Sequence, residues 1–299
     1  MSGIAIYDLL CIGNYTKDTI ISPSGVKYVD GGAMNYAAHA ASRLGLNVAV
    51  VTRLAQEDQR VVDKFTAQHI DCYATYTPES TCMKPDYPTL DPDIRTLSVT
   101  STAGSIHAQD IANLQAKAAV IGSSLRGEVG LDVICALKEK KIFLAADMQG
   151  FVRVLRAQSL VYEPWEDMEA TLAYLDVVKS DAVEAEHLTG EADIHRAAKI
   201  FSHMGPKEIV LTHKDGVLLF AGGEYYQAGF YPRNLNGRSG RGDTCIGSYM
   251  AMRNSLNPPQ ALIWAAALTS LKMEKLGPFD RSIDDVQALI CEKYDHHLL

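Results

Sequence analysis

The chain has 299 residues, of which 47% are hydrophobic and 21% are charged, and its formal net charge is −8. This balance is typical of a globular protein with a sizeable core, and the negative charge argues against a nucleic-acid partner. No apolar run approaches the roughly 20 residues of a membrane span, so no membrane partner is expected. Residues 1–12 lack the features of a signal peptide, and no two cysteines are spaced as Cys-x-x-Cys, which favours reduced thiols and a cytoplasmic location.

Short apolar runs alternate with helical stretches along most of the chain. Strands are expected at 4–12, 48–51, 118–121, 142–146, 175–179 and 209–212. Helices are expected at 33–44, 56–69, 131–140, 182–188, 194–204, 242–254, 259–274 and 283–294. Two hairpins are expected, 19–21 with 26–29 and, at a sheet edge, 217–220 with 225–229. This alternation predicts an α/β fold, a three-layer α/β/α sandwich with a mostly parallel sheet.

One stretch, 71–103, departs from the alternation. Tyrosines, prolines and acidic residues are mixed there with short β-like runs such as 96–100. Together with 14–30, this stretch is expected to form a small β lid on a single domain that spans 1–299. A lid of this kind is also compatible with a homodimer.

A glycine-rich loop precedes the helix expected at 242–254. It contains Gly240, Arg241 and Gly242, and Asp243 follows directly. The free N–H groups and positive dipole at a helix N-terminus attract anions, and glycine lets an anion approach the backbone. A carboxylate beside an anion site suits a base that takes a proton from a hydroxyl attacking phosphate. The alternative is that this loop only begins a helix.

Several polar segments begin where a predicted strand ends. They are 13–18, 147–153, 179–184 and 212–216, and 237–243 follows the edge hairpin. Because ligands of an α/β sheet bind beyond the carboxyl ends of its strands, these segments are expected to form one site.

These motifs resemble those of the ribokinase-like (PfkB) sugar kinase family. Gly240–Asp243 is similar to the family's C-terminal signature, and the Gly31–Gly32 pair opening a helix that ends at Leu44–Gly45 is similar to its N-terminal signature. The resemblance covers nearly the whole chain. It implies an ATP-dependent phosphotransferase with Mg²⁺ that phosphorylates a hydroxyl of a sugar or polyol.

The resemblance also implies a role for each candidate residue. Asp243 would be the general base, with anion-binding N–H groups from Gly240, Arg241 and Gly242. The substrate-binding candidates are Asp18, Gly31, Gly32, Asn35 and Arg153. The nucleotide-binding candidates are Lys179, Thr212 and Gly216, and the metal candidates are Asp181 and Glu184.

One further motif narrows the acceptor. Asp147, Gln149 and Arg153 form an Asp-x-Gln-x-x-x-Arg run that resembles myo-inositol kinases of this family, so a cyclitol such as myo-inositol is the first expectation. The alternative is a surface ion pair between Asp147 and Arg153. Gly237 stands where the family has an aspartate, which argues against a family-type potassium site.

Two other functions stay open at this level. A nucleoside kinase of the same fold would need a ring that stacks on a base, for which Tyr15 and Tyr36 are candidates. A non-catalytic relative would bind a nucleotide or small molecule without turnover, although the presence of Asp243 argues against it.

Overall fold

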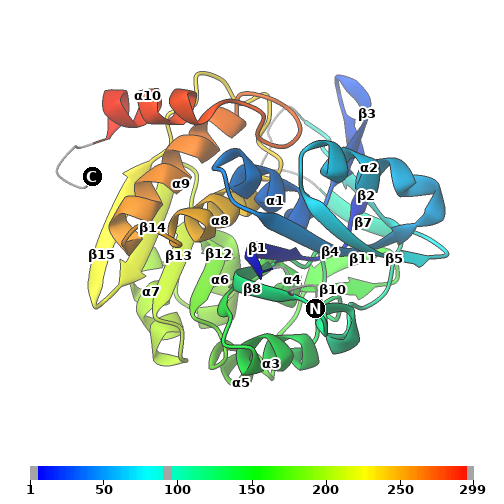
Figure 1. Ribbon diagram of the computed structural model, residues 1–299, viewed down its shortest axis with the longest axis horizontal. Coiled ribbons are helices and arrows are strands. Elements are labelled where there is room, and N and C mark those ends of the chain that lie inside the picture. The colour runs from blue at the N-terminus through cyan, green and yellow to red at the C-terminus, as the bar shows by residue number, and fades with distance from the viewer. Residues whose placement is uncertain (1–5, 90–95, 295–299) are drawn as a thin grey trace.

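A computed structural model describes residues 6–89 and 96–294, and two β-sheets form its framework (Figure 1). The larger sheet has nine strands in the order β15-β14-β13-β12-β9-β8-β1-β4-β5. Their bounds are β1 Ile6–Ile12, β4 Val48–Ala55, β5 Asp71–Thr77, β8 Gln115–Ile121, β9 Phe143–Asp147, β12 Val177–Asp181, β13 Glu208–Thr212, β14 Gly216–Ala221 and β15 Glu224–Gly229. Only the β13–β14 and β14–β15 pairs are antiparallel in this sheet, so the expected edge hairpin is present. Residues 4 and 5 of the first expected strand lie outside the described residues.

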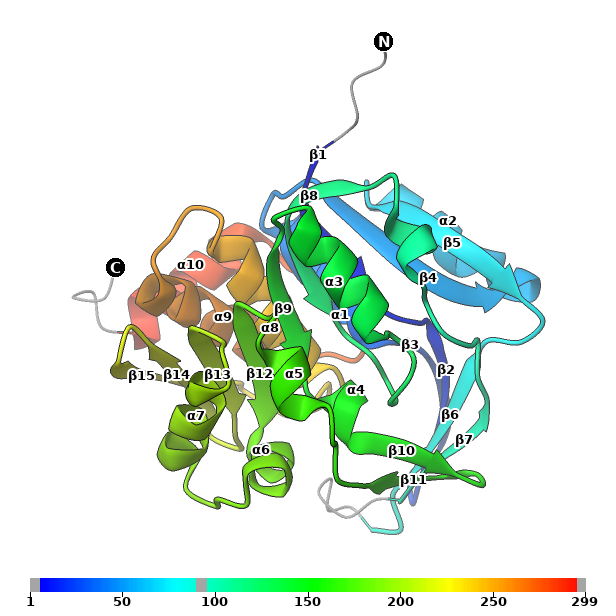
Figure 2. The same ribbon diagram turned by 90° about the horizontal axis from the view of Figure 1, so that it is seen from below.

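Helices cover both faces of the large sheet. Figure 2 shows α3, α5 and α7 on one side, with α1, α8 and α9 behind the sheet. The helices are α1 Ala33–Arg43, α2 Gln59–Ala67, α3 Leu131–Glu139, α4 Gln149–Val152, α5 Met168–Leu172, α6 Ala182–Thr189, α7 Ile194–His203, α8 Arg241–Met252, α9 Pro258–Lys272 and α10 Ile283–Lys293. Two separate apolar cores result, one on each face. Within the described residues, no helix is long and apolar enough to cross a membrane.

The small residues of α1 and α8 allow these two helices to pack closely. A Cβ placed on Gly247 of α8 would lie 2.5 Å from the Cα of Ala37 in α1. That distance is too short for any larger residue, so the backbones are in near contact. The two glycine-rich segments that open these helices are thereby brought to the same end of the molecule.

The second sheet has six strands in the order β10-β11-β7-β6-β2-β3. Their bounds are β2 Thr16–Ser22, β3 Gly25–Gly31, β6 Thr81–Asp86, β7 Thr96–Ser101, β10 Arg153–Arg156 and β11 Ser159–Tyr162. The expected hairpin at 19–29 is the β2–β3 pair. The sequence did not predict that β10 and β11 join this sheet, nor that β5 lies at the edge of the large one. The role of the smaller sheet as a lid stays a prediction, and part of its expected range, 90–95, lies outside the described residues.

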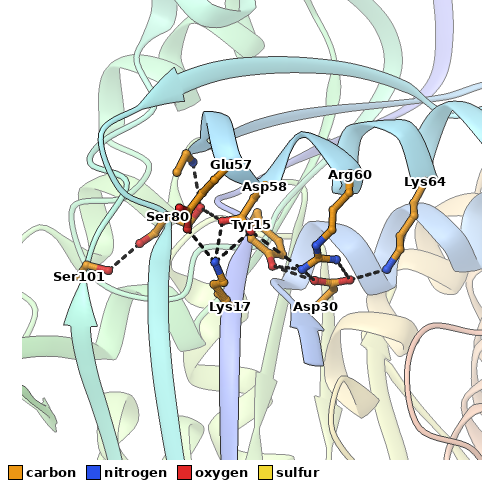
Figure 3. Close-up of polar contacts among 10 residues, drawn as sticks. Tyr15, Lys17, Asp30, Glu57, Asp58, Arg60, Lys64, Ser80 and Ser101 are labelled. Carbon is orange, nitrogen blue, oxygen red and sulfur yellow. Dashed lines mark hydrogen bonds and ion pairs between the residues drawn. The ribbon is translucent and has the colours of Figure 1, made fainter. Parts of the chain in front are cut away.

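A polar network joins the second sheet to α2 and the 3₁₀ turn Gln56–Asp58 before it (Figure 3). Asp30 of β3 accepts hydrogen bonds from both terminal nitrogens of Arg60 at 2.7 Å and from Lys64 Nζ at 2.6 Å. Asp58 accepts one from the Ser80 hydroxyl at 2.6 Å and pairs with Lys17 of β2. The smaller sheet is therefore fastened to the main body by two carboxylates. For brevity we call these residues the Asp30–Asp58 network.

Candidate active site

A cavity of about 570 Å³ lies where the carboxyl ends of the large sheet's strands face the second sheet. β12 and β13 end at it, and β2, β6, β7 and β11 cover it. Most residues singled out from the sequence line it: Asp18, Gly32, Arg153, Lys179, Asp181, Thr212, Gly240, Arg241, Gly242 and Asp243. Segments far apart in the sequence thus meet at one edge of the sheet.

The other candidates lie behind this lining. A Cβ on Gly31 would lie 2.4 Å from Asp18 Oδ2, so Gly31 leaves room for that carboxylate. Asn35 is buried, and its Nδ2 donates to the backbone oxygen of Asp30 at 3.1 Å. Gly216 opens β14 against the backbone of β15. Glu184 is buried behind Arg153.

The loop before α8 has the conformation that its glycines allow. Gly240 is in the left-handed region with φ 76°, and a Cβ there would lie 2.4 Å from Tyr36 Cδ1. A Cβ on Gly242 would lie 2.3 Å from Lys179 Nζ. Neither position can hold a larger residue without moving its neighbour. The Lys179 ammonium consequently lies directly against the first turn of α8.

Two buried ion pairs stand beside this turn. Lys179 Nζ lies 2.7 Å from Asp147 Oδ2, and both residues are buried. Arg153 Nη2 lies 3.5 Å from Glu184 Oε1. The hypothesis of a surface pair between Asp147 and Arg153 is therefore wrong, since each has another partner and neither is exposed. Burial acts to lower the pKa of Lys179, but Asp147 and nearby carboxylates hold it above its usual value, so Lys179 stays charged.

Asp243 lies in the first turn of α8 and is partly exposed to the cavity. Removal from bulk water raises the pKa of its carboxyl to about 6; repulsion by Asp147 adds to this and Lys179 opposes it. A carboxylate with a pKa close to neutral is better suited to accept a proton from a hydroxyl than an ordinary aspartate.

Asp181 and Glu184 form a reciprocal cap at the start of α6. Asp181 Oδ1 accepts from the Glu184 N–H at 2.8 Å, and Glu184 Oε2 accepts from the Asp181 N–H at 3.1 Å. Burial and then the charge of Asp181 raise the pKa of Glu184 to about 7. The pair therefore has an evident structural role at the helix N-terminus.

The same two carboxylates are the available ligands for Mg²⁺. Among the described residues, no group of three or more His, Cys, Asp or Glu side chains is placed to hold a metal ion. Magnesium is commonly bound by one or two carboxylates together with substrate phosphates and water. Burial is the main cause of the raised pKa of Glu184, and the charge of Asp181, which adds to it, is one that a divalent cation would neutralise. Asp181 and Glu184 thus fit a site that the phosphoryl donor would complete.

Some residues of the site were not predicted from the sequence. Ser124, Tyr162 and Arg238 line the cavity, and Met83 and Leu97 reach it from the second sheet. Tyr162 lies in a strand whose pairing with β10 and β7 is not evident from its neighbours in the chain. Arg238, in contrast, could have been found as a second basic residue in the glycine-rich loop.

Comparison with known proteins gives a family and a set of similar structures. The family described as pfkB family carbohydrate kinase matches residues 1–282. A pyrophosphate-dependent kinase of the ribokinase family, solved with a pyrophosphate analogue and myo-inositol, is 33% identical with a TM-score of 0.87, over 94% of this chain and 99% of that one. A pyrophosphate-dependent myo-inositol-1 kinase, converted by mutation into a myo-inositol-3 kinase, has the same identity and TM-score over 96% and 100%.

More distant structures match in fold. Arabidopsis thaliana ribokinase, solved with ribose and ATP, is 16% identical with a TM-score of 0.76, over 96% of this chain and 99% of that one. The ribokinase-like fold predicted from the sequence is therefore confirmed. No curated protein sequence matches the chain.

Proposed function

We propose that this chain, which belongs to the pfkB family of carbohydrate kinases and is thus a sugar or polyol kinase, transfers a phosphoryl group from pyrophosphate to a hydroxyl of a cyclitol such as myo-inositol. Relatives of similar length, one third identical in sequence, are described as pyrophosphate-dependent and as myo-inositol kinases. The motif with Gln149 and Arg153 predicted the same acceptor. The donor predicted from the family resemblance was ATP.

The observation that carries the proposal is the set of charges around Asp243. Four cationic side chains, Arg153, Lys179, Arg238 and Arg241, line the same cavity as this carboxylate. Pyrophosphate has several negative charges and no base or ribose, so guanidinium and ammonium groups are what would recognise it. Arg153 and Lys179 also pair with Glu184 and Asp147, so Arg238 and Arg241 are the additional cations that a neutral acceptor alone would not require.

Other residues of the lining suit a polyhydroxylated ring. Asp18, Thr16 and Gln149 provide hydrogen-bonding groups there, while Met83 and Leu97 provide apolar surface. An ionised carboxylate only accepts hydrogen bonds, so Asp18 would orient substrate hydroxyls. The apolar side chains would contact the C–H groups of the ring.

The proposed reaction uses Asp243 as general base. Asp243 takes the proton of the attacking hydroxyl, whose oxygen forms a bond to phosphorus as the bond to the leaving phosphate breaks. The N–H groups of Gly240 and Gly242 stabilise the charge on the transferred group, and Arg153 and Lys179 help to neutralise the leaving phosphate. The Arg241 N–H, which the sequence also offered for this role, instead donates to the Arg238 oxygen at 3.2 Å. Magnesium, when held by Asp181 and Glu184, would supply further neutralisation of phosphate oxygens.

The geometry does not favour a nucleoside acceptor. Tyr15 is fully buried, and its hydroxyl donates to Asp30 Oδ1 at 2.8 Å. Tyr36 is 3% exposed, with Gly240 and the Lys272 ammonium against its ring. Neither ring offers a free face on which a base could stack.

The test is a matrix of donors and acceptors followed by ³¹P NMR. Pyrophosphate or ATP, each with Mg²⁺, would be combined with myo-inositol, two of its stereoisomers, fructose, ribose, inosine and cytidine. We expect one inositol monophosphate and one inorganic phosphate for each pyrophosphate consumed. If only ATP supports turnover, the proposal of pyrophosphate as donor is wrong. If only nucleosides are phosphorylated, the proposal of a cyclitol as acceptor is wrong. Binding of the donor by thermal shift, with no product from any pair, would favour a non-catalytic protein.

A further inference from the structure

A buried lysine lies beneath the glycine-rich loop, outside the cavity lining. Lys272 is the last residue of α9 and only 2% exposed. Its Nζ donates hydrogen bonds to the backbone oxygens of Gly237 and Ser239 and lies 4.9 Å from the centroid of the Tyr36 ring. Two carbonyl oxygens and an aromatic face are favourable partners for a desolvated cation. The ammonium is therefore held by the loop, and the loop by the ammonium.

Other contacts fix the same stretch of backbone. The Gly237 N–H donates to the Met273 oxygen at 2.7 Å, and a Cβ on Gly237 would lie 1.8 Å from the Lys275 oxygen. The Ser239 side chain hydrogen-bonds Tyr36. The loop is thus packed between the end of α9 and the first turn of α1, with Lys272 between them.

The direction of the two carbonyls determines the direction of the next N–H groups. In a trans peptide the C=O of one residue and the N–H of the following residue point in opposite directions. Because the oxygens of Gly237 and Ser239 face Lys272, the N–H groups of Arg238 and Gly240 face away from it. Arg238 and Gly240 line the cavity, whereas Lys272 does not.

We propose that Lys272 is a positioning residue, whose ammonium orients the loop so that its N–H groups face the transferred phosphoryl group. The proposal rests on the proposed phosphotransferase function of the cavity. The ammonium beneath the loop belongs to the chain itself, so catalysis would not depend on a dissolved monovalent cation at this place. Burial lowers the pKa of Lys272 to about 8, and the negative charge of Asp243 opposes that shift, so the ammonium is still the main form at neutral pH.

Substitution at this position distinguishes a cation from a space-filling side chain. Lys272→Ala would leave two inward-facing oxygens and an aromatic face, which ammonium or potassium can fill. Lys272→Met would fill the space with a neutral chain of similar length. Lys275→Ala is the matched control, because Lys275 is three residues further along, 66% exposed and paired with Asp280 at the surface.

We expect both Lys272 variants to lose about 100-fold in kcat, as when one donor of an oxyanion site is removed, with a smaller change in KM for the acceptor. Added ammonium or potassium chloride should raise the kcat of Lys272→Ala at least tenfold. The same salts should leave the kcat of Lys272→Met unchanged. Lys275→Ala should match the unsubstituted protein, whose rate should be equal in potassium, sodium and choline chloride. Circular dichroism would verify that each variant folds.

Several results would overturn the proposal. They are near-normal kcat in Lys272→Met, equal rescue of both variants by ammonium, or a requirement of the unsubstituted protein for potassium. If the unsubstituted protein transfers no phosphoryl group, the proposed function fails. The role of Lys272 would then be tested by the thermal stabilisation that pyrophosphate gives to each variant. That stabilisation should be lost in both variants and return with ammonium only in Lys272→Ala; equal stabilisation in all variants would contradict the positioning role.

Discussion

Two charged networks, one beside the cavity and one between the second sheet and α2, differ in how exposed their cations are. Beside Asp243, the Lys179–Asp147 and Arg153–Glu184 pairs have no side chain more than 10% exposed. In the Asp30–Asp58 network, the cations Lys17, Arg60 and Lys64 have side chains 41–61% exposed (Figure 3).

The difference shows what each network can do. An exposed cation that is removed is replaced by water, so its loss costs little. A buried cation that is removed leaves an unpaired charge in a poorly solvated place. Buried pairs are therefore a weak source of stability but a strong source of electrostatic field, which a phosphoryl-transfer site needs. The exposed network is better suited to fastening the second sheet.

The largest effect on turnover is expected from Asp243→Asn, which is compared with the same substitution at Asp58 in the Asp30–Asp58 network. Asp243→Asn removes the base and should lower kcat by about 10² to 10⁴-fold with the fold intact. Asp58→Asn, at a buried carboxylate that does not line the cavity, should lower stability and keep most of the turnover. Steady-state rates and thermal unfolding would be measured for both. Retained turnover in Asp243→Asn would sink its assignment as base.

A large loss of stability is expected from Lys179→Met. The substitution leaves Asp147 buried without its partner, which should lower the free energy of unfolding by about 3–5 kcal/mol. The control is Lys179→Met combined with Asp147→Leu, which removes both charges and should recover much of that loss. Urea unfolding would give both values. Equal stability of the single and double variants would mean that water solvates Asp147 after all.

The pH dependence of the rate should report the environment of Asp243. Only the ionised carboxylate accepts a proton, and the pKa of Asp243 is raised to about 6 by burial and by Asp147. As pH falls below about 6, kcat/KM should fall tenfold per unit, and above that value it should level off. The profile of the unsubstituted protein checks this. An acid limb near the ordinary aspartate pKa of about 4 would contradict the burial of this group.

The smallest effect is expected from Lys64→Ala in the exposed network. Lys64 is 61% exposed, and Asp30 keeps both hydrogen bonds from Arg60. The free energy of unfolding should fall by less than about 1 kcal/mol, and the difference should shrink at high salt. Turnover should be unchanged, as measured with saturating donor and acceptor. A clear drop in kcat would show that the Asp30–Asp58 network also influences the chemistry.

Much of the framework could be predicted because its signals are local. Alternating apolar runs predicted the strands and helices of the large sheet, and glycines predicted the starts of α1 and α8. The helix expected at 56–69 begins as the 3₁₀ turn Gln56–Asp58, and its α-helical part, Gln59–Ala67, ends two residues earlier than expected. Periodicity and turn chemistry depend on residues close in sequence, so a single chain reveals them.

Charge partners could not be predicted in the same way. Asp147 and Arg153 are six positions apart, and a pair between them was the alternative to a functional role, yet Asp147 pairs with Lys179 and Arg153 with Glu184. The contacts of Lys272 with the glycine-rich loop arise only because α9 packs against that loop, and nothing near Lys272 in the sequence indicates them. β10 and β11 belong to the second sheet because β11 pairs with β7, which is distant from it in the sequence.

The sequence by itself determined the type and order of the elements and the presence of a carboxylate at the start of α8, because local backbone preferences and apolar spacing are written in neighbouring residues. Only the tertiary structure decided which charges face each other, which of them lose contact with water, and how far the pKa of Asp243 rises. These properties depend on distance in space and on local polarity, and both arise only when segments distant in the sequence pack together.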